Sequence, residues 1–472
     1  MSIDQAILDR LVAIVGQKAC LTEASDIAPY LEEERGLYHG ATSVVVRPGS
    51  TDEVAAVVTL CAEEGIGIVP QGGNTGLCGG GIPAENGSEI ILALGRMNAV
   101  RGIDPTNFTM TVDAGCILTD IQNKADEQDC LFPLSLGAEG SCQIGGNLAT
   151  NAGGINVLRY GNARDLVLGL EVVLPDGRVW NGLRALGKDN TGYALKQLFV
   201  GSEGSLGVIT AAVLKLFPKP RETETAFCAL NSLDDVTRLL NRARALSGDA
   251  VTAFELVPRI GLEFCTRHID GVTDPLSEAY DWYTLIEFST SRPNSDLRAG
   301  FEGLLEAAFE DGIIVDAVIA ESQAQAENLW RIRESLPEAQ KHEGGSIKHD
   351  VSVPVSLVPE FVTRGTAAVL KAYPGARPCP FGHVGDGNVH FNVSQPEDMD
   401  KDAYLSEWEA MNRIVHDLVM DMNGSISAEH GIGRLKVEEM EYYKDAVELD
   451  LMKTLKAALD PKCTMNPGKV VH

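Results

Sequence analysis

Three glycine-rich blocks between residues 70 and 210 constrain what this chain can fold into more than any other feature. The first, Pro70–Gly81, follows a short apolar run, and seven of its twelve residues are Gly or Asn. The second comprises residues 141–154 and 160–165, and the third residues 198–210. Backbone without side chains lets consecutive N–H groups converge on an anion. A single block is compatible with a merely flexible loop, whereas three indicate a long ligand lying across one domain.

The first block matches neither of two common nucleotide motifs. It lacks the Gly-Lys-Ser/Thr ending of a Walker loop, and no helix is expected directly after it, as a dinucleotide fingerprint requires. Upstream of it, Val44–Val46 predicts a strand, and Ser50 and Glu53 have capping-box spacing for a helix that Gly65 ends. Residues 4–38 are expected to be helical.

A domain boundary is predicted at Leu216–Arg221, where a strand end is followed by two prolines. Beyond it, residues 223–421 alternate helical and strand-like runs without glycine-rich blocks. Leucines at 451, 455 and 459 indicate a C-terminal amphipathic helix. We therefore expect an α+β protein with a ligand-binding domain at 1–220, a cap domain at 221–421 and a C-terminal segment at 422–472.

The densest chemistry lies in residues 382–392, Gly-His-Val-Gly-Asp-Gly-Asn-Val-His-Phe-Asn. Glycine and asparagine at 385–388 favour a tight turn. If this turn closes a hairpin, His383 and His390 become a directly opposed cross-strand pair, with Cβ atoms roughly 4.5–5.5 Å apart. Asn392 then points to the same face of the strand as His390.

Two imidazoles at that spacing can bind one divalent metal. A short strand from Ser425 is expected to stop at Glu429-His430 and break into a glycine loop, where Glu429 is a candidate third ligand. Two His and one carboxylate suit zinc with an open position, while manganese and iron stay open. Taken alone, the His pair is also compatible with packing or hydrogen bonding in a glycine turn.

The composition of the chain limits which classes of partner it can bind and which cellular compartment it suits. The formal net charge of −28 argues against a nucleic-acid partner, because phosphates would be repelled. The ten cysteines are scattered without a C-x-x-C pair, which favours reduced thiols over a disulfide framework. No run approaches the ~18 apolar residues of a membrane helix. The first residues lack the features of a signal or transit peptide, so we expect a cytoplasmic protein.

The order of the glycine blocks resembles the FAD-binding domain of the vanillyl-alcohol oxidase / p-cresol methylhydroxylase family. The resemblance implies FAD, with the Gly72–Gly76 loop on the pyrophosphate and the later blocks along the isoalloxazine and adenine. The first loop has no histidine for covalent attachment, which implies a non-covalent flavin. Similar C-terminal endings in this family return to the flavin, with Asn466 at the matching position. The implied FAD contacts are Pro70, Gly72, Gly73, Asn74, Thr75, Gly76, Leu77, Pro133, Ser141, Gly145, Gly146, Thr150, Asn151, Gly153, Gly161, Glu203, Gly204, Gly207, Ile209 and Asn466.

A second resemblance links four segments, 329–334, 348–350, 382–392 and 427–433, to the D-2-hydroxyglutarate / D-lactate dehydrogenase branch of that family. The two resemblances together cover nearly the whole chain. The second implies zinc ligands at His383, His390 and Glu429, a substrate contact at Asn392, and His430 as the catalytic base.

The chemistry of 2-hydroxy acid oxidation suits these residue types. The hydroxyl must lose a proton, which a histidine with a pKa of ~6.5 is suited to accept. Zinc on the hydroxyl and carboxylate would lower the hydroxyl pKa, and the flavin would take the hydride at N5. Arg333 and Lys348 are the expected carboxylate contacts, because a guanidinium binds a carboxylate through two parallel hydrogen bonds. Position 337 is Pro where the branch usually has Thr, and Ser335 is a candidate substitute.

Two functions from different classes follow. The first is an FAD- and zinc-dependent D-2-hydroxy acid dehydrogenase, with D-2-hydroxyglutarate ahead of D-lactate or D-malate. The second is a flavin-bearing electron-carrier subunit whose metal hairpin is only structural. The resemblance further implies an electron-transfer flavoprotein, or another protein or quinone, as electron acceptor, and a homodimer.

Overall fold

The computed structural model describes residues 3–248 and 250–471, which fall into two compact units. Unit 1 comprises Met1–Gly153, Gly161–Lys219 and Glu429–His472, and unit 2 comprises Gly154–Tyr160 and Pro220–Ala428. The C-terminal stretch therefore belongs to unit 1 from Glu429 on, and a short segment from inside the glycine-rich region belongs to unit 2. The domain limits expected from the sequence stay predictions.

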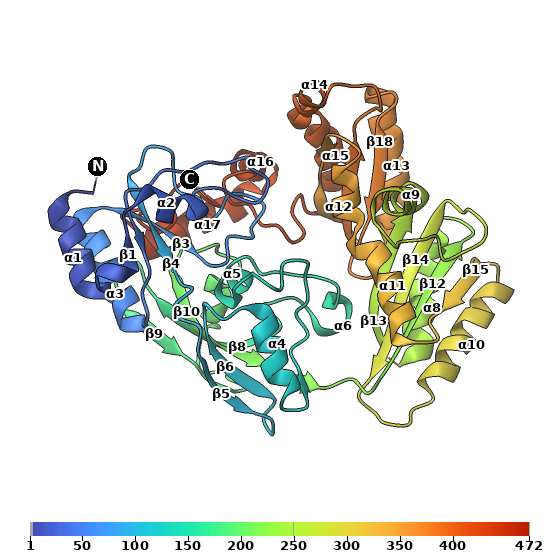
Figure 1. Ribbon diagram of the computed structural model, residues 1–472, viewed down its shortest axis with the longest axis horizontal. Helices are drawn as coiled ribbons and strands as arrows, with labels where there is room; N and C mark the ends of the chain where they lie inside the picture. Colours follow the sequence, from blue (N-terminus) through green and yellow to red (C-terminus); the bar gives the residue numbers. More distant parts are fainter. Residues whose placement is uncertain (1–2, 249, 472) are drawn as a thin grey trace. The chain divides into compact units, whose positions relative to one another are not determined.

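Unit 1 combines two sheets with peripheral helices (Figure 1). Its strands are β1 Cys20–Leu21, β2 Val45–Val46, β3 Gly67–Gln71, β4 Glu89–Ala93, β5 Val100–Asp104, β6 Thr109–Asp113, β7 Cys130–Leu131, β8 Val167–Val173, β9 Val179–Gly182, β10 Val208–Lys215 and β11 Phe217–Pro218. Its α-helices are α1 Gln5–Val15, α2 Ala24–Ile27, α3 Thr51–Glu64, α4 Leu118–Asp126, α5 Ile144–Ala149, α7 Lys196–Phe199, α16 Val437–Tyr443 and α17 Ala446–Leu459, with 3-10 turns η1 Gln17–Ala19 and η2 Ala28–Tyr30.

The two sheets of unit 1 differ in strand direction. The first has the order β1-β2-β4-β3, with β4 parallel to both β2 and β3. The second is antiparallel throughout, in the order β5-β6-β10-β8-β9, and β7 pairs separately with β11. The first glycine-rich block follows β3 directly, so the parallel sheet presents that block at the carboxyl end of a buried strand.

Helix α3 follows the expected local rules. Ser50 caps it, with its hydroxyl oxygen accepting a hydrogen bond from the Glu53 N–H at 3.2 Å. The Glu53 carboxylate accepts from the Gly49 N–H at 2.7 Å instead of the Ser50 N–H, so the capping box is shifted by one residue. Gly65 ends the helix with a φ of 68°. The apolar face of α3 packs into the core of the parallel sheet.

The expectation of helix over residues 4–38 is confirmed for α1, α2 and the two 3-10 turns, and is wrong for β1 and for residues 31–38. Helix α1 ends at Gly16, whose φ of 85° takes the backbone out of the helical region. After η1 the chain forms β1, which pairs antiparallel with β2. Strand pairing therefore overrides the local helical pattern at residues 20–21.

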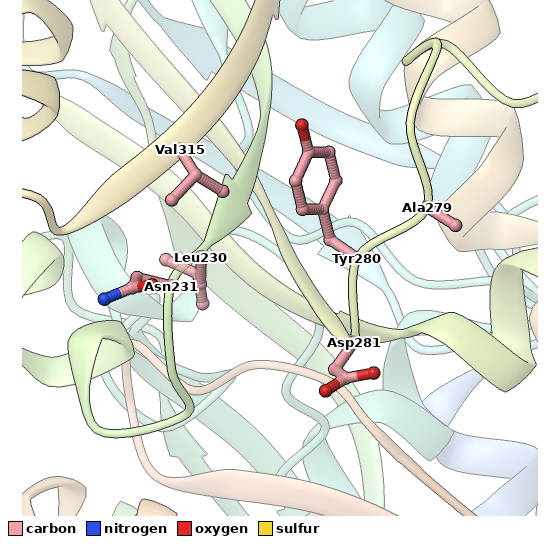
Figure 2. Close-up of a pocket in the computed structure, with 6 residues that line it drawn as sticks. All are labelled: Leu230, Asn231, Ala279, Tyr280, Asp281 and Val315. Carbon is pink, nitrogen blue, oxygen red and sulfur yellow. The ribbon is translucent and has the colours of Figure 1, made fainter.

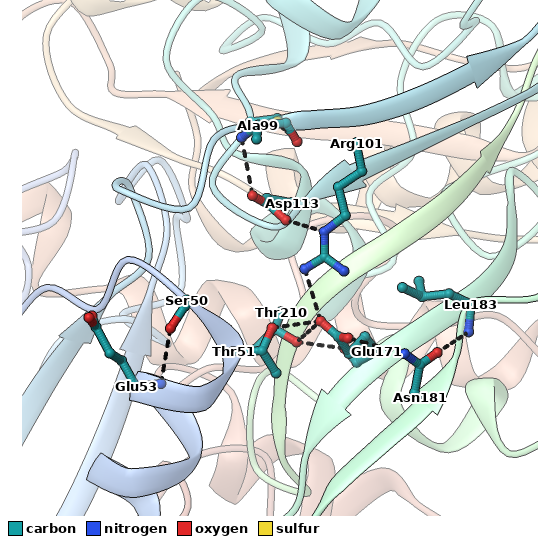
Figure 3. Close-up of polar contacts among 11 residues, drawn as sticks. Ser50, Thr51, Glu53, Ala99, Arg101, Asp113, Glu171, Asn181, Leu183 and Thr210 are labelled. Atoms are coloured by element: carbon teal, nitrogen blue, oxygen red, sulfur yellow. Dashed lines mark hydrogen bonds and ion pairs between the residues drawn. The ribbon is translucent and has the colours of Figure 1, made fainter. Parts of the chain in front are cut away.

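A buried carboxylate connects α3 to the antiparallel sheet (Figure 3). Glu171 on β8 is 6% exposed and accepts hydrogen bonds from Thr51 Oγ1 at 2.6 Å, Thr210 Oγ1 at 3.0 Å and Arg101 Nη2 at 3.0 Å. Arg101 also donates through Nε to Asp113 Oδ1 at 2.6 Å. Burial alone would raise the pKa of Glu171, but Arg101 and the two hydroxyls outweigh it and lower the pKa.

Unit 2 contains an antiparallel sheet flanked by helices, a smaller sheet, and a further helical layer (Figure 1). Its strands are β12 Glu222–Leu230, β13 Val251–Pro258, β14 Trp282–Thr290, β15 Ile314–Ile319, β16 Ser346–Ile347, β17 Asp350–Ser352, β18 Arg377–Phe381 and β19 Asn388–Ser394. Its helices are α6 Val157–Tyr160, α8 Asp235–Ser247, α9 Arg259–His268, α10 Leu297–Glu310, α11 Gln323–Glu334, α12 Leu336–Lys341, η3 Val355–Leu357, α13 Val358–Ala372, α14 Lys401–Leu405 and α15 Trp408–Asp421.

The larger sheet of unit 2, in the order β13-β14-β12-β15, is buried on both faces. Along β12, Ala226, Cys228 and Leu230 belong to one core cluster together with residues of α8 and α10. Phe227 and Ala229 belong to a second cluster with residues of α9, α11 and α12. The alternation of a strand thus supplies two cores, one on each side of the sheet, which is why residues 226–230 of β12 form a continuous apolar run.

The smaller sheet corrects the expected register of the histidine hairpin. Strand β19 pairs with β18 on one edge, and with β16 and β17 on the other. His390 lies opposite Phe381 and Asp350, not opposite His383. The reason is Gly382, with a φ of 134°, which exchanges backbone hydrogen bonds of 2.9 and 3.2 Å with Leu256. Pairing between β18 and β19 therefore stops at Phe381, and the backbone at Gly382 pairs with β13 instead, before the chain reaches His383.

The C-terminal stretch contains the expected helix, α17, and then returns to the parallel sheet of unit 1. Ile68 in β3 donates to the Thr464 carbonyl, and Asn466 donates back to the Ile68 carbonyl, both at 2.8 Å. The strand expected from Ser425 to Glu429 reduces to a single bridge between Ser425 and Ser352. None of the ten cysteines, all of which lie in the described part of the chain, is in a disulfide, and nine of them are buried. Among the described residues, no helix is both long and apolar enough to cross a membrane.

The Glu171 network yields a stability prediction. Glu171→Ala should cost on the order of 2 kcal/mol, because it leaves the buried Thr210 hydroxyl, the Thr51 hydroxyl and the partly exposed Arg101 guanidinium without their acceptor. The matched control Asp176→Ala removes an exposed pair with Arg178, 53% and 78% exposed, and should cost about 0–1 kcal/mol. Urea unfolding followed by tryptophan fluorescence measures both losses, and equal losses would contradict the prediction.

The same network predicts a pH dependence. The pKa of Glu171 is lower in the folded than in the unfolded chain, where a glutamate titrates at about 4.3. Its contribution is therefore complete above that pH and is lost as the pH falls through the lower folded value. The unfolding midpoints of the wild type and of Glu171→Ala should converge in that acidic window.

Candidate active site

The three glycine-rich blocks converge in unit 1. A Cβ added at Gly73 would lie 2.1 Å from the Ser141 carbonyl oxygen, so the first and second blocks pack backbone to backbone. A Cβ at Gly204 would lie 3.0 Å from the Pro70 ring, which brings the third block against the start of the first. Gly76 and Gly146 have nothing within 4 Å of the same position. The blocks therefore pack tightly against one another and leave open space beside glycine backbone.

Side chains from neighbouring segments hold the first block in place. Asn74, with a φ of 56°, donates through Nδ2 to the Glu32 carbonyl at 2.8 Å. Gln71 donates through Nε2 to the Gly81 carbonyl at 2.8 Å, which closes the loop across its base. In the second block, the Asn151 side chain accepts from the Arg164 N–H at 3.0 Å. The remaining predicted FAD contacts in unit 1 are Gly72, Thr75, Leu77, Pro133, Gly145, Thr150, Gly161, Gly207 and Ile209.

The segment after Glu429 is fixed to the third glycine block. Glu203 accepts hydrogen bonds from the Ile432 and Gly433 N–H groups at 2.8 and 2.9 Å. Burial raises the pKa of Glu203, although these bonds act in the opposite direction. Asn466 is 1% exposed and donates through Nδ2 to the carbonyls of Gly80 and Glu203, at 2.9 and 2.7 Å. This amide thus connects the chain end to the first and third blocks.

Glu429 lies against the second glycine block. A Cβ added at Gly153 would lie 2.4 Å from Glu429 Oε1, so only glycine at 153 leaves room for this carboxylate. Glu429 and His430 are both half-buried. The predicted third ligand, Glu429, therefore lies beside backbone that the sequence assigned to the flavin, and His430, the predicted base, is the next residue in the chain.

In unit 2, one buried carboxylate joins two of the predicted site residues. Glu255 on β13 is 1% exposed and accepts from Arg333 Nε at 2.6 Å. Its other oxygen lies 2.7 Å from His383 Nδ1. Burial would raise the pKa of Glu255, but His383 and Arg333 together hold it down to about 2. Glu255 therefore stays ionised between the predicted metal ligand and the predicted substrate cation.

The two predicted histidine ligands are close despite the shifted register. The ring centroids of His383 and His390 are 5.4 Å apart, with the planes nearly perpendicular. His390 Nδ1 lies 3.8 Å from Asp350 Oδ1 on the neighbouring strand. Burial raises the pKa of nearby Asp386 to about 6, with His383 acting to lower it. Two imidazoles and several carboxylates thus gather at one end of the smaller sheet.

The predicted substrate contacts differ in their burial and in their hydrogen-bond partners. Asn392 on β19 is buried and donates through Nδ2 to Gln340 Oε1 at 2.8 Å. Arg333, near the end of α11, is 6% exposed, and its guanidinium carbon lies 4.9 Å from the centroid of the Phe381 ring. Lys348 lies between β16 and β17 and is half-buried. Ser335 joins α11 to α12 and is half-buried, with its N–H donating to the Arg331 carbonyl at 3.1 Å.

Sequence reasoning missed two of these side chains. Asp350 is the last residue of a Lys-His-Asp segment already singled out, and its spacing two residues after Lys348 was an available signal. Its side chain accepts from Asn388 Nδ2 at 3.0 Å and faces His390. Glu255 gave no local signal, because it is an isolated acid in an apolar strand, 128 residues before His383.

The residues present fit the two implied groups. Open space borders the glycine backbone at Gly76 and Gly146, which suits a large ligand that carries a pyrophosphate, such as FAD. In unit 2, His383 keeps Nδ1 on a carboxylate, the arrangement that metal-binding histidines commonly have. His390 and Asp350 add the nitrogen and oxygen donors that zinc accepts.

A separate cavity in unit 2 is not this site. It has a volume of about 320 Å³ and is lined by Leu230, Asn231, Ala279, Tyr280, Asp281 and Val315 (Figure 2). The Tyr280 hydroxyl lies 3.4 Å from Asp316 Oδ2. None of the predicted site residues is among the six lining residues.

Comparison with known families decides what kind of protein this is. Residues 219–470 match the family described as FAD linked oxidases, C-terminal domain, and residues 42–182 match the FAD binding domain. The chain belongs to the FAD-linked oxidase family. It is therefore an FAD-dependent oxidoreductase, and the FAD expected from the glycine blocks is confirmed as its cofactor.

Curated relatives of this FAD-linked oxidase cover most of its length. The D-2-hydroxyglutarate dehydrogenase of Xanthomonas citri pv. viticola is 37% identical over 95% of this chain and 93% of that protein. The mitochondrial enzymes of the same name from Danio rerio and Arabidopsis thaliana are 39% and 37% identical, over 92% and 100% of this chain and 79% and 82% of those proteins. The resemblance stated from the sequence is confirmed.

Solved structures establish the fold. The structure of p-cresol methylhydroxylase with substrate bound superposes with a TM-score of 0.77 at 16% identity, over 99% of this chain and 97% of that one. An alkyldihydroxyacetonephosphate synthase superposes with a TM-score of 0.76 at 18% identity, over 98% and 86%. The p-cresol methylhydroxylase-type fold expected from the sequence is confirmed.

Asn466 offers a test of flavin binding by the chain end. Asn466→Ala removes the donor to Gly80 and Glu203, and FAD affinity should fall about tenfold, equivalent to about 1.4 kcal/mol. Asn423→Ala is the matched control. Both asparagines have a positive φ, 43° at Asn466 and 56° at Asn423, but Asn423 is exposed and belongs to unit 2. Flavin absorbance retained after ultrafiltration measures both, and equal retention would contradict the prediction.

Proposed function

We propose that this FAD-linked oxidase oxidises a D-2-hydroxy acid, with D-2-hydroxyglutarate as the first choice, using non-covalent FAD and a zinc ion. The supporting observation is similarity to proteins named for D-2-hydroxyglutarate, at 35–39% identity over nine-tenths or more of the chain. When bound, zinc supplies a Lewis acid and FAD a two-electron acceptor at N5. The remaining tasks fall to side chains of the protein.

We assign the binding and orientation of metal and substrate to the following residues. His383, His390 and Glu429 are the proposed metal ligands, with Asp350 beside His390 as a further oxygen donor. His430 is proposed as the base that takes the hydroxyl proton onto a ring nitrogen. Asn392, held by Gln340, is proposed to donate to the substrate, with Arg333, Lys348 and Ser335 on its carboxylates.

The order of substrates rests on a second carboxylate. Arg333 uses Nε for Glu255, and its two terminal amino groups make no hydrogen bond with the described residues. These two groups have the fork geometry that binds a carboxylate. D-lactate has only one carboxylate, so it is placed behind the dicarboxylates, and D-malate is a shorter alternative. Pro337 stands where the branch usually has Thr, so this chain lacks the hydroxyl donor of that Thr. The rates on acids of different length therefore decide which substrate is preferred.

Partners and location are also proposals. An electron-transfer flavoprotein, or another protein or quinone, is proposed as the acceptor of the flavin electrons, and the chain as a homodimer. A cytoplasmic location is proposed from the ten cysteines, none of which is in a disulfide, while the Danio and Arabidopsis relatives are named mitochondrial.

Anaerobic flavin reduction tests the proposed activity. Mixed with D- and L-2-hydroxy acids, the protein should lose its flavin absorbance with D-2-hydroxyglutarate and keep it with the L-enantiomer. Initial rates on D-2-hydroxyglutarate, D-malate and D-lactate then give the order of substrates. A many-fold preference for D-lactate would reverse the proposed order, and no bleaching with any of these acids would end the proposal.

Metal removal separates catalysis from a structural role. After treatment with a chelator, turnover should be lost while circular dichroism stays unchanged, and added zinc should restore turnover. The alternative, a flavin electron-carrier subunit with a structural metal, predicts loss of folding on the same treatment. Turnover that persists in metal-free protein would exclude a catalytic zinc.

A further inference from the structure

Glu255 occupies a position that the proposed function does not yet use. It lies in β13, where all eight residues are buried, and its carboxylate is shared between two donors from distant parts of unit 2. One donor, Arg333, comes from α11, and the other, His383, comes from the loop between β18 and β19. Burying a carboxylate is unfavourable unless such partners compensate for the lost hydration.

We propose that Glu255 is a positioning residue that fixes the ring of His383 for metal binding and the guanidinium of Arg333 for substrate binding. The proposal rests on the proposed function, because it assigns Glu255 to the same site. It adds one residue that links the metal half of that site to the substrate half.

The argument for His383 follows from its two ring nitrogens. Because a carboxylate only accepts hydrogen bonds, Nδ1 must carry the proton in the 2.7 Å contact with Glu255. The neutral ring then presents its lone pair at Nε2, the nitrogen that could bind a metal without losing Glu255. A carboxylate in this position fixes both the tautomer and the orientation of a metal-binding histidine.

The argument for Arg333 follows from its planar fork. Nε is held by Glu255 at 2.6 Å, and the guanidinium carbon lies 4.9 Å from the Phe381 ring centroid. With Nε and one face engaged, the plane of the group is set, and its terminal amino groups form the remaining edge. That edge can bind one carboxylate through two parallel bonds.

Glu287 on the adjacent strand β14 provides a structural comparison. It is also in the interior of this sheet, and its Oε2 accepts from Trp330 Nε1 at 2.8 Å. Glu255 instead accepts from Arg333 Nε at 2.6 Å and lies 2.7 Å from His383 Nδ1. One glutamate thus has an indole donor outside the proposed site, while the other has two donors that belong to that site.

Glu255→Gln tests the proposal, with Glu287→Gln as the matched control. An amide has one accepting oxygen and one donating nitrogen, so it cannot accept from both Arg333 and His383. Zinc affinity, measured by competition with a chromogenic chelator, should fall about 10- to 100-fold in Glu255→Gln and stay unchanged in Glu287→Gln. Unchanged zinc affinity in Glu255→Gln, or an equal loss in both variants, would overturn the proposal.

Two further measurements distinguish a failure of this proposal from a failure of the proposed function. In metal-free protein, nitrogen NMR of labelled histidine should show His383 protonated on Nδ1 in the wild type and shifted to the other tautomer in Glu255→Gln. The KM for D-2-hydroxyglutarate should rise in Glu255→Gln more than kcat falls. A wild type without activity but with the Nδ1 tautomer would end the proposed function alone. A wild type lacking that tautomer would end the role of Glu255.

Discussion

Backbone packed directly against backbone is the constraint on which unit 1 depends. Gly73 meets the Ser141 carbonyl so closely that any side chain would collide with it, and Gly153 leaves room for the Glu429 carboxylate in the same way. Side chains at these positions would push the glycine-rich blocks apart. The glycines therefore serve two purposes at once, since they bring distant segments together and expose N–H groups to a ligand. This double use explains why three separate blocks are needed.

Local chemistry was readable from the sequence wherever a short-range rule decided the structure. The cap at Ser50, the end of α3 at Gly65 and the strand before the first block all follow from residues within one turn or one strand. The overall fold and the FAD also followed, because the glycine blocks recur in a fixed order. The helical pattern failed at residues 20–21 because pairing with β2, a non-local interaction, stabilises a strand there.

Long-range geometry explains what the sequence could not provide. The register of β18 and β19 depends on Gly382 pairing with Leu256, a residue more than a hundred positions earlier. Turn chemistry at 385–388 correctly predicts a reversal but says nothing of that third strand. The role of Glu255 could not be predicted for the same reason, because its partners Arg333 and His383 are distant in the sequence. His383 and His390 are not the directly opposed pair that was predicted, yet their ring centroids lie 5.4 Å apart.

Charge and hydrogen-bond geometry together give a physical reason for the proposed preference for dicarboxylates. The chain as a whole is strongly acidic, so an anionic substrate needs local positive charge. In the proposed site, Glu429 and Asp350 would together offset the charge of a divalent metal, so Lys348 is the positive charge left for one substrate carboxylate. Arg333 is paired with Glu255, and it therefore contributes geometry more than net charge. Its terminal amino groups form a fork that a second carboxylate would fill through two hydrogen bonds, whereas a monocarboxylate such as lactate leaves this buried fork unused, which is costly.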